Sequence, residues 1–440
     1  MSRKQYSRAI VIGAGIGGLI SARVLSDFFD EVVVIERDEL PDSMSSRKGI
    51  PQGFHNHSLL EGGRLVLEKF FPGFCDDLLA MGNLAINQTK DIKWFHHGVW
   101  KTRKAVDRTM FLQSRWHLEG LLRQKVKSIN NVSWLQKTVT GLTVVDKKIH
   151  SVRTTGGEYT ADLILEAGGR GSRLLEWLGV EGIDAPLVSK NRLELKYASQ
   201  LYKRGNSTTD WQLLAVYPDA PKGNCSGVVF PIVHEEYGPC WMVSLIGRNG
   251  DYAGSTQEEF LALAKNLDQS DIYDFIKDLT PLLQRPAQVS FSESRWVHYE
   301  RMKNRPTGIL PIGDSYGHIN PIYGQGVSIS LMEADILYKS LAKSESLPKA
   351  ESLYLKKVAK FFSMPWLLIC CEDWRYPQVE NRPPFIGIVN AYSRKLHRLS
   401  SVDKGVIRDV YDVLNFTKHP LVLYKPTTVL KVLFKRVQNS

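Results

Sequence analysis

The chain has 440 residues, of which 43% are apolar and 10% aromatic, so it can bury more than one sizeable core. Its net charge of +11 comes from scattered basic residues without a recognised nucleic-acid motif, so we expect no nucleic-acid partner. Five cysteines without metal-ligand spacing favour a reducing cytoplasm and predict no metal site. The sequence shows no signal peptide and no apolar run near the ~18 residues that cross a bilayer, which also predicts a cytoplasmic protein.

A nucleotide-binding motif lies near the start of the chain. The apolar strand Ala9–Ile12 leads into a glycine-rich turn, an apolar-periodic helix and a second strand. In the dinucleotide fingerprint, Gly13 makes the tight turn, Gly15 lets the backbone approach a pyrophosphate, and Gly18 lets helix and strand pack closely. Glu36, at the end of the second strand, is placed to bind the adenosine ribose hydroxyls. The segment therefore predicts a bound dinucleotide.

A second, antiparallel sheet is predicted from two separate parts of the chain. Residues 81–105 contain two short strands, whereas a helix at 114–128 and a strand and tight loop at 161–173 return to the first domain. From about 186 to 300 the pattern is alternating and strand-rich, with one amphipathic helix at 256–268. This pattern predicts an antiparallel sheet that forms a roof over the ligand.

The segment 308–326 completes the nucleotide site about 300 residues after the first motif. An apolar strand leads to Asp314, whose carboxylate can accept hydrogen bonds from ribose-type hydroxyls. A helix then opens at Gly324-Gln325-Gly326 and aims its N–H groups at the ligand, where the helix dipole favours negative charge. NAD needs only the first motif, whereas FAD is longer and needs a second, distant segment. The two motifs together therefore predict FAD.

Residues 346–440 are helical and rich in aromatic residues, and we expect them to cap a substrate cavity. Beyond Pro426 the chain reads as a short helix with one apolar face, made of Val429, Leu430, Leu433, Phe434 and Val437. A basic amphipathic helix can lie on an anionic membrane and would give peripheral membrane contact. A helix docked on its own domain is the favoured alternative.

Together these elements predict an α/β fold in which a Rossmann-like FAD-binding domain is interleaved with an antiparallel β-sheet substrate domain, followed by a C-terminal helical cap. The FAD-binding domain is expected at 1–80, 106–185 and 301–345, the substrate sheet at 81–105 and 186–300, and the helical region at 346–440. Neither internal repeats nor low-complexity linkers separate these parts, which is why interleaving is expected.

In these motifs the chain resembles the aromatic-hydroxylase-like, single-chain FAD monooxygenases. The resemblance is closest to the branch containing the bacterial polyether epoxidases of monensin and lasalocid biosynthesis, with squalene epoxidase a more distant relative. It covers nearly the whole chain and also rests on five further segments: Arg47–His57, Ser114–Glu119, Trp241–Gly247, Trp296–Arg301 and Asp373–Pro377.

The resemblance implies a set of FAD contacts. It assigns the adenosine half to Gly13, Gly15, Gly18, Glu36 and Arg37, the adenine to Val139, the pyrophosphate and ribityl regions to Arg47 and Arg115, the ribityl chain to Asp314, and the flavin to Gly324, Gln325 and Gly326. Gly168 stands where the family usually has an aspartate that organises NAD(P)H docking. We therefore expect a separate flavin reductase, or slow surface reaction with NAD(P)H, as the electron source. His55 and His57 are the candidates for facing the cavity, with structural roles as the alternative, and His318 reads as a turn residue without a catalytic role.

The implied chemistry is insertion of one oxygen atom from O₂ through a C4a-hydroperoxide of reduced FAD. The branch implies epoxidation of a lipophilic alkene, a polyene or terpenoid, in secondary metabolism. We expect six aromatic residues to form its apolar cavity: Trp241, Trp296, Trp366, Trp374, Phe361 and Phe362. A flavin-dependent prenyl reductase, an aromatic hydroxylase, a flavin halogenase and a flavin-bearing sensor without turnover stay open, although the G-x-W-x-W-x-I-P element of tryptophan-type halogenases is missing.

Overall fold

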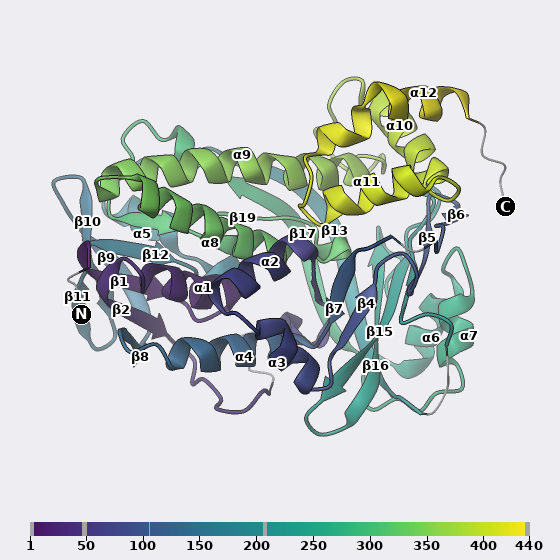
Figure 1. Cartoon of the computed structure of the whole chain (residues 1–440), viewed down its shortest axis with the longest axis horizontal. Coiled ribbons are helices and arrows are strands. Elements are labelled where there is room, and N and C mark those ends of the chain that lie inside the picture. The colour runs from purple at the N-terminus through teal and green to yellow at the C-terminus, as the bar shows by residue number, and fades with distance from the viewer. Residues whose placement is uncertain (1–3, 46–50, 105, 206–208, 436–440) are drawn as a thin grey trace.

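A five-stranded parallel sheet forms the N-terminal side of the molecule (Figure 1). The computed structural model describes residues 4–45, 51–104, 106–205 and 209–435. In sheet order the strands are β18 (Ile309–Pro311), β12 (Leu163–Glu166), β1 (Tyr6–Ile12), β2 (Phe29–Glu36) and β8 (Val132–Gln136). The central strands contain runs of apolar residues, Ala9–Ile12, Val32–Ile35 and Leu163–Leu165, that are buried, as expected for parallel strands covered on both faces.

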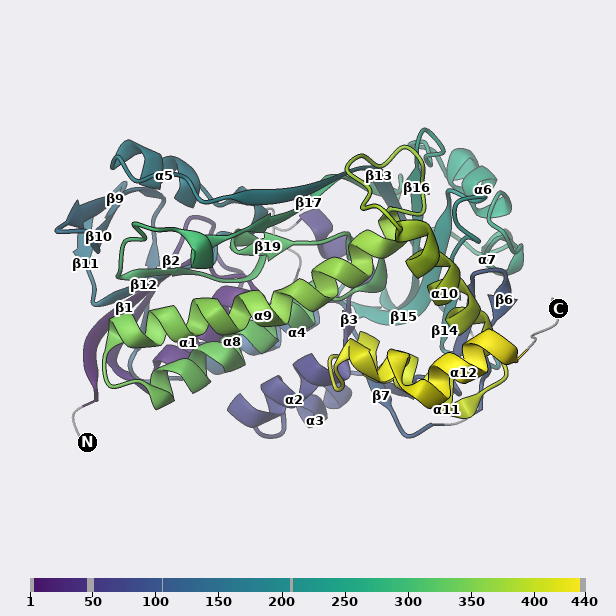
Figure 2. The same cartoon turned by 90° about the horizontal axis from the view of Figure 1, so that it is seen from above.

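Helices and a small antiparallel sheet share one apolar core with this parallel sheet. The small sheet consists of β9 (Val139–Val145), β10 (Lys148–Thr154) and β11 (Gly157–Thr160). The helices are α1 (Ile16–Leu25), α2 (Glu61–Phe70), α3 (Phe74–Ala80), α4 (Arg115–Lys127), α5 (Leu174–Val180), α8 (Gly326–Lys343) and α9 (Leu347–Asp373). Helix α8 contacts both α1 and α9, and Figure 2 shows α9 running from this region toward the C-terminal helices.

An eight-stranded sheet forms the other side of the molecule. Its order is β19 (Gly317–His318), β17 (Ala287–Val297), β13 (Val188–Lys203), β16 (Gly238–Arg248), β15 (Ser226–His234), β14 (Leu213–Val216), β5 (Ile92–His96) and β6 (Val99–Trp100). Every neighbouring pair is antiparallel except β14 and β5. Two helices cover one face, α6 (Gln257–Lys265) and α7 (Asp271–Ile276). The helix predicted at 256–268 is present as α6, which ends at Lys265, whereas α7, which begins after Ser270, was not predicted.

Short elements connect the two sides. A three-stranded sheet consists of β3 (Ser58–Leu59), β7 (Thr109–Leu112) and β4 (Leu84–Asn87). The 3₁₀ helices are η1 (Pro51–Phe54), η2 (Gly169–Gly171), η3 (Tyr299–Arg301), η4 (Gly313–Ser315), η5 (Pro321–Tyr323) and η6 (Pro420–Tyr424). Since strands of the parallel sheet alternate along the chain with strands of the eight-stranded sheet, the predicted interleaved α/β fold class is confirmed.

The C-terminal region continues from α9 into α10 (Ile386–Leu399), α11 (Lys404–Leu414) and α12 (Pro426–Phe434). Helix α12 is docked on its neighbours: Val432 is buried, and Lys431 pairs with Asp403 at 2.9 Å. Leu433 and Phe434 of the predicted apolar face point outward, with exposed fractions of 55% and 78%. Val437 lies outside the described residues. Within the described ranges, no helix combines the length and hydropathy needed to cross a bilayer.

We predict that Gly18→Ala destabilises the protein, whereas Gly15→Ala leaves its stability nearly unchanged. A Cβ on Gly18 would lie 1.9 Å from the carbonyl oxygen of Gly13, so α1 would have to move away from the turn, but a Cβ on Gly15 would meet nothing within 4 Å. Overpacking of this kind typically costs ~1–3 kcal/mol or more of unfolding free energy, and the Gly15 variant should lose less than ~1 kcal/mol. Urea denaturation of both purified variants checks the difference, and equal stabilities would contradict it.

Candidate functional site

One continuous cavity of about 840 Å³ joins the parallel sheet to the eight-stranded sheet. One end lies at the carboxyl ends of β1, β2 and β12, beside the glycine-rich turn after β1. The other end is walled by the eight-stranded sheet and α11. Ligands of parallel α/β sheets bind outside the carboxyl ends of the strands, and pockets for them measure roughly 300–1,000 Å³. The cavity therefore has room for a large ligand that reaches both sheets.

Two helix N-termini face this cavity. Gly15 precedes α1, Gly326 opens α8, and both line the cavity. Among the residues that the structure describes, no side chain caps either helix, which leaves their first N–H groups for a ligand. The space around Gly15 is open, so a ligand can approach the backbone there. Phosphates and other groups with negative charge are the ligands that such N-termini bind.

A carboxylate stands beside each of these helix starts. Glu36 accepts hydrogen bonds from the backbone N–H groups of Ala14 (2.8 Å) and Asp38 (3.1 Å), which fix its side chain beside the glycine-rich turn. Asp314 follows β18 in η4, and its side chain is 38% exposed. Arg170 lies 3.9 Å from the Asp314 carboxylate. Both carboxylates line the cavity and can accept hydrogen bonds from ligand hydroxyls.

Most of the other predicted cofactor residues also lie at the cavity. Those that line it are Gly13, Arg37, Arg115, Val139 and Gly324. Gly18 and Gln325 are not among the described lining residues, because Gly18 packs against Gly13 and the Gln325 amide donates to the carbonyl of Leu414 (3.2 Å). Arg47 lies outside the described residues.

A buried carboxylate from the Asp373–Pro377 motif holds the turn that precedes α8. Asp373 accepts hydrogen bonds from the Asn320 side chain (2.8 Å) and from Arg248 (3.2 Å), and it is fully buried. The side-chain amide oxygen of Asn320 in turn accepts a hydrogen bond from the backbone N–H of Ile322 (3.2 Å), which fixes the η5 turn. The C-terminal motif therefore orients the start of α8.

The loop after β12 shows what surrounds Gly168. The carboxylate of Glu166 is buried and accepts hydrogen bonds from the Gly168 N–H (3.1 Å) and the Ser172 hydroxyl (2.8 Å). A Cβ at position 168 would lie 2.5 Å from that carboxylate. A side chain there would therefore displace Glu166, a cavity residue that the sequence pattern presented only as the end of a strand.

The two histidines predicted to face the cavity, His55 and His57, both line it. His55 is 6% exposed, and its Nδ1 lies 2.7 Å from the Ser199 hydroxyl, which contacts the Ser244 hydroxyl at 2.5 Å. Its Nε2 is buried and has no hydrogen-bond partner among the described atoms. Burial, and to a lesser degree the charge of Arg170, lowers the pKa of His55 to about 4. A neutral imidazole with an unpaired nitrogen therefore faces the ligand space.

His318 is a cavity residue that sequence reasoning missed. It lies in β19, paired with Arg295 of β17, and not in a turn as expected, so its ring is held at the cavity wall. Its Nδ1 is buried without a partner in the described part of the chain. Burial lowers the pKa of His318 despite the nearby charge of Asp314, which acts in the opposite direction. A local sequence pattern of two residues is too short to predict this strand.

The far end of the cavity is lined by one face of the eight-stranded sheet. Side chains two positions apart on each strand point into it, as expected for the pleat of a sheet. They are Ile92 and Trp94 of β5, Leu213 and Ala215 of β14, Val228 and Phe230 of β15, Ser244 and Ile246 of β16, and Val289 and Phe291 of β17. Tyr411 and Leu414 of α11 close this end. The result is an apolar, aromatic chamber.

The six aromatic residues expected to form the cavity are absent from its described lining, so that prediction is wrong. Trp241 occupies the opposite strand parity from Ser244 and packs with Trp211 on the helix-covered face of the sheet. Trp296 packs against Phe362 and Trp366 in the core beside α9. Phe361 packs against the same core, and Trp374 packs against a separate apolar cluster. Of the C-terminal helices, only α11 supplies described lining residues, so the expected cap is confined to that helix.

The donor set at the first end fits FAD. A dinucleotide requires backbone N–H groups for its pyrophosphate and an acidic residue for its ribose, and α1 and Glu36 offer both. The second carboxylate and second helix start, Asp314 and α8, extend the site beyond the length of one mononucleotide half. The apolar chamber then lies beyond the position at which the flavin would end.

The comparisons with known proteins agree on the fold. No family model matches the chain. Protein Rv3254 of Mycobacterium tuberculosis is 29% identical over 360 residues, which cover 78% of this chain and 74% of that protein. PqsL of Pseudomonas aeruginosa, a probable FAD-dependent monooxygenase, superposes with a TM-score of 0.65 at 16% identity, over 88% of this chain and 99% of its own.

Two further solved structures are similar. The tetrameric form of 2-methyl-3-hydroxypyridine-5-carboxylic acid oxygenase has a TM-score of 0.63 at 16% identity, over 94% of this chain and 98% of its own. A triple mutant of the flavin-dependent brominase Bmp2 has a TM-score of 0.58 at 13% identity, over 96% of this chain and 93% of its own. The chain therefore has the fold that FAD-dependent monooxygenases and a flavin-dependent brominase share.

We predict that His55 makes the stability of the protein fall in acid. The unfolded imidazole takes up a proton near pH 6.5, whereas the buried ring resists protonation until about pH 4. The unfolded state therefore binds more protons between these values, and stability present above pH 6.5 is lost as the pH falls, by ~3 kcal/mol for this residue. Urea denaturation of His55→Gln from pH 7 to pH 4 should show a shallower loss than the wild type. The exposed-site control His150→Gln should follow the wild type, and parallel wild-type and His55→Gln profiles would refute the assignment.

Proposed function

We propose that the protein is a monooxygenase that binds FAD non-covalently and transfers one oxygen atom from O₂ to a lipophilic substrate. The supporting observation is the continuous cavity, which offers two uncapped helix starts and two carboxylates at one end and an apolar chamber at the other. Solved structures with this fold are named as FAD-dependent or as oxygenases. FAD, when bound, supplies the redox chemistry and the activation of O₂.

In this proposal the protein binds and orients FAD and the substrate, and it keeps water out of the cavity. The N-terminus of α1 and Glu36 hold the adenosine diphosphate half, Asp314 accepts hydrogen bonds from the ribityl hydroxyls, and the N-terminus of α8 faces the flavin ring. His55 lines the cavity as a neutral imidazole whose buried Nε2 has no hydrogen-bond partner among the described atoms. The aromatic walls exclude bulk water, which would otherwise consume reactive intermediates.

We propose an electron-rich alkene, a polyene or terpenoid of secondary metabolism, as the substrate and its epoxide as the product. Tyr197 and Tyr217 line the chamber, but their hydroxyls donate to Asn320 (3.3 Å) and to the carbonyl of Ile322 (2.9 Å). They therefore turn ring surface, and not hydroxyl groups, toward the substrate, which suits a ligand with few polar groups. Hydroxylation of an aromatic ring is the second candidate, because PqsL has been crystallised with 2-aminobenzoylacetate.

We further propose that electrons arrive from a separate flavin reductase. The supporting observation is that Glu166 fills the space beside Gly168, where relatives place the aspartate that organises nicotinamide docking. Slow reduction by NADPH at the surface is compatible with this proposal.

We expect Asp314→Ala to weaken FAD binding. Hydrogen bonds to a charged carboxylate contribute ~1.5–3 kcal/mol, which corresponds to about ten- to a hundredfold in the dissociation constant. Titration of apoprotein with FAD, followed by flavin fluorescence, measures this change. Asp184→Ala, at an exposed aspartate outside the described lining, is the matched control and should bind FAD like the wild type. Wild-type affinity in the Asp314 variant would argue against this placement of FAD.

The reaction is tested by incubating the protein with ¹⁸O₂ and a panel of polyenes and phenols. Electrons are supplied in one arm by NADPH alone and in the other by a flavin reductase. We expect mass spectrometry to find one labelled oxygen on an alkene carbon, with much faster turnover in the reductase arm. A labelled phenol would establish the second candidate, whereas saturation without label or halide incorporation would overturn monooxygenation. Rapid, saturable reduction by NADPH alone would overturn the proposed electron source.

A further inference from the structure

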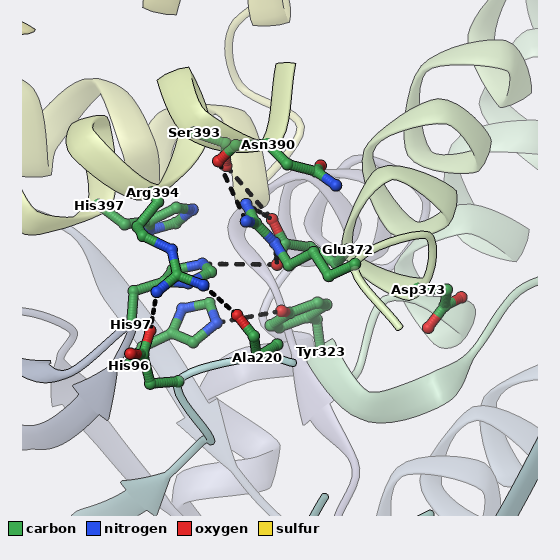
Figure 3. A network of polar contacts seen from close by, with 12 residues as sticks. His96, His97, Ala220, Tyr323, Glu372, Asp373, Asn390, Ser393, Arg394 and His397 are labelled. Atoms are coloured by element: carbon green, nitrogen blue, oxygen red, sulfur yellow. Dashed lines mark hydrogen bonds and ion pairs between the residues drawn. The ribbon is translucent and has the colours of Figure 1, made fainter. Parts of the chain in front are cut away.

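Three histidines meet at the edge of the eight-stranded sheet, outside the cavity and next to its aromatic wall (Figure 3). His96 ends β5, His97 follows in the turn to β6, and His397 comes from the last turn of α10. Their ring centroids lie 3.9, 4.8 and 4.9 Å apart, and one nitrogen from each ring lies within 4.8 Å of the nitrogens of the other two. Trp94 of the cavity stacks on His96 (5.4 Å).

One ring nitrogen of each histidine in this histidine cluster, Nδ1, has no hydrogen-bond partner in the described structure. Nδ1 of His96, His97 and His397 is buried in each case, and within the described residues none makes a hydrogen bond. His96 and His97 are 4% and 0% exposed, so bulk water does not compensate them. A buried polar atom without a partner typically costs ~1–3 kcal/mol. A shared ligand that accepts three nitrogen lone pairs at once would remove this cost.

The Nε2 atoms of His96 and His97 each lie near an oxygen atom, as the second nitrogen of a metal-ligating histidine does. His97 Nε2 lies 3.4 Å from a carboxylate oxygen of Glu372, which is an ion-pair distance and not yet a hydrogen bond. His96 Nε2 lies 3.5 Å from the hydroxyl of Tyr323, a cavity residue. A carboxylate or hydroxyl on the outer nitrogen fixes the tautomer and leaves the other nitrogen as a lone pair for a metal. Figure 3 shows both contacts.

The charges around the histidine cluster restrict which ion it can hold. Glu372 is paired with Arg375 (2.7 Å), Arg394 is paired with Asp219 (2.8 Å), and the Lys101 ammonium donates to the carbonyl of His397. With one carboxylate already shared, the site lacks the several oxygen ligands that Ca²⁺ and Mg²⁺ require. Neutral imidazoles instead suit Zn²⁺, Cu²⁺ and Ni²⁺.

We propose that His96, His97 and His397 bind one divalent transition-metal ion through their Nδ1 atoms, with Zn²⁺ as the ordinary occupant and Glu372 as the outer partner of His97. At zinc–nitrogen distances of ~2.0–2.1 Å, tetrahedral ligands lie ~3.3 Å apart, so the nitrogens, which lie within 4.8 Å of one another, would move closer when the ion binds. The ion would tie α10 to the β5–β6 turn behind the chamber wall. Its role is structural and does not depend on the reaction proposed above.

The test is metal binding by the purified, flavin-containing protein. After equilibration with Zn²⁺ and removal of the excess, mass-spectrometric metal analysis should find one zinc per chain in the wild type. His97→Ala and His397→Ala should each lose at least nine-tenths of it, and the exposed-histidine control His150→Ala should retain it. Less than a tenth of an equivalent in the wild type, or equal retention in His397→Ala, would overturn the proposal.

Zinc-edge X-ray absorption of the wild type decides the question even if the variants do not fold. We expect scattering from three imidazole nitrogens at about 2.0 Å; a spectrum with fewer than three imidazoles would overturn the site. Removal of the ion by a chelator should also lower the unfolding temperature, with recovery on adding Zn²⁺, because an ion that binds only the folded chain stabilises it.

Discussion

The buried contact between Asp373 and Arg248 connects the three parts of this molecule. The carboxylate ends α9, the guanidinium comes from β16, and Asn320 and Asn191 donate to the same carboxylate at 2.8 and 3.2 Å. Removing one partner of such a pair typically costs 3–5 kcal/mol, because it leaves a buried charge uncompensated. The eight-stranded sheet, the turn before α8 and the C-terminal helices are therefore held in one relative position. The cavity between them keeps its shape for the same reason.

The parts of the site that could be predicted from the sequence are those whose structure and chemistry come from the same few residues. A glycine-rich turn between a strand and a helix, with Glu36 at the end of the next strand, specifies both the backbone path and the groups that it offers to a ligand. The same holds for Asp314 and the start of α8. In both places short-range sequence determines geometry, so the pattern was sufficient to place the residues at the cavity.

The substrate chamber could not be predicted in this way, because its lining depends on strand parity and register. Trp94 and Ala215 face each other across the parallel pair of β5 and β14, an arrangement that no local pattern contains. Successive residues of β16 point to opposite faces of the sheet. Trp241, which was expected at the chamber, therefore lies on the opposite face from Ser244. The histidine cluster was even less predictable from the sequence, because His397 lies beside His96 and His97 only when α10 is packed on the sheet.

The order of the strands has a consequence for how this protein is made. β12 pairs with β18, but most of the eight-stranded sheet, from β13 at Val188 to β17 at Val297, is synthesised between them. At typical translation rates of 5–20 residues per second, the edge of β12 waits on the order of ten seconds for its neighbour to leave the ribosome. During that time an apolar strand edge is open to wrong pairing, and contacts so distant in sequence also form slowly. The nascent chain is thus expected to need protection by a chaperone until β18 has emerged.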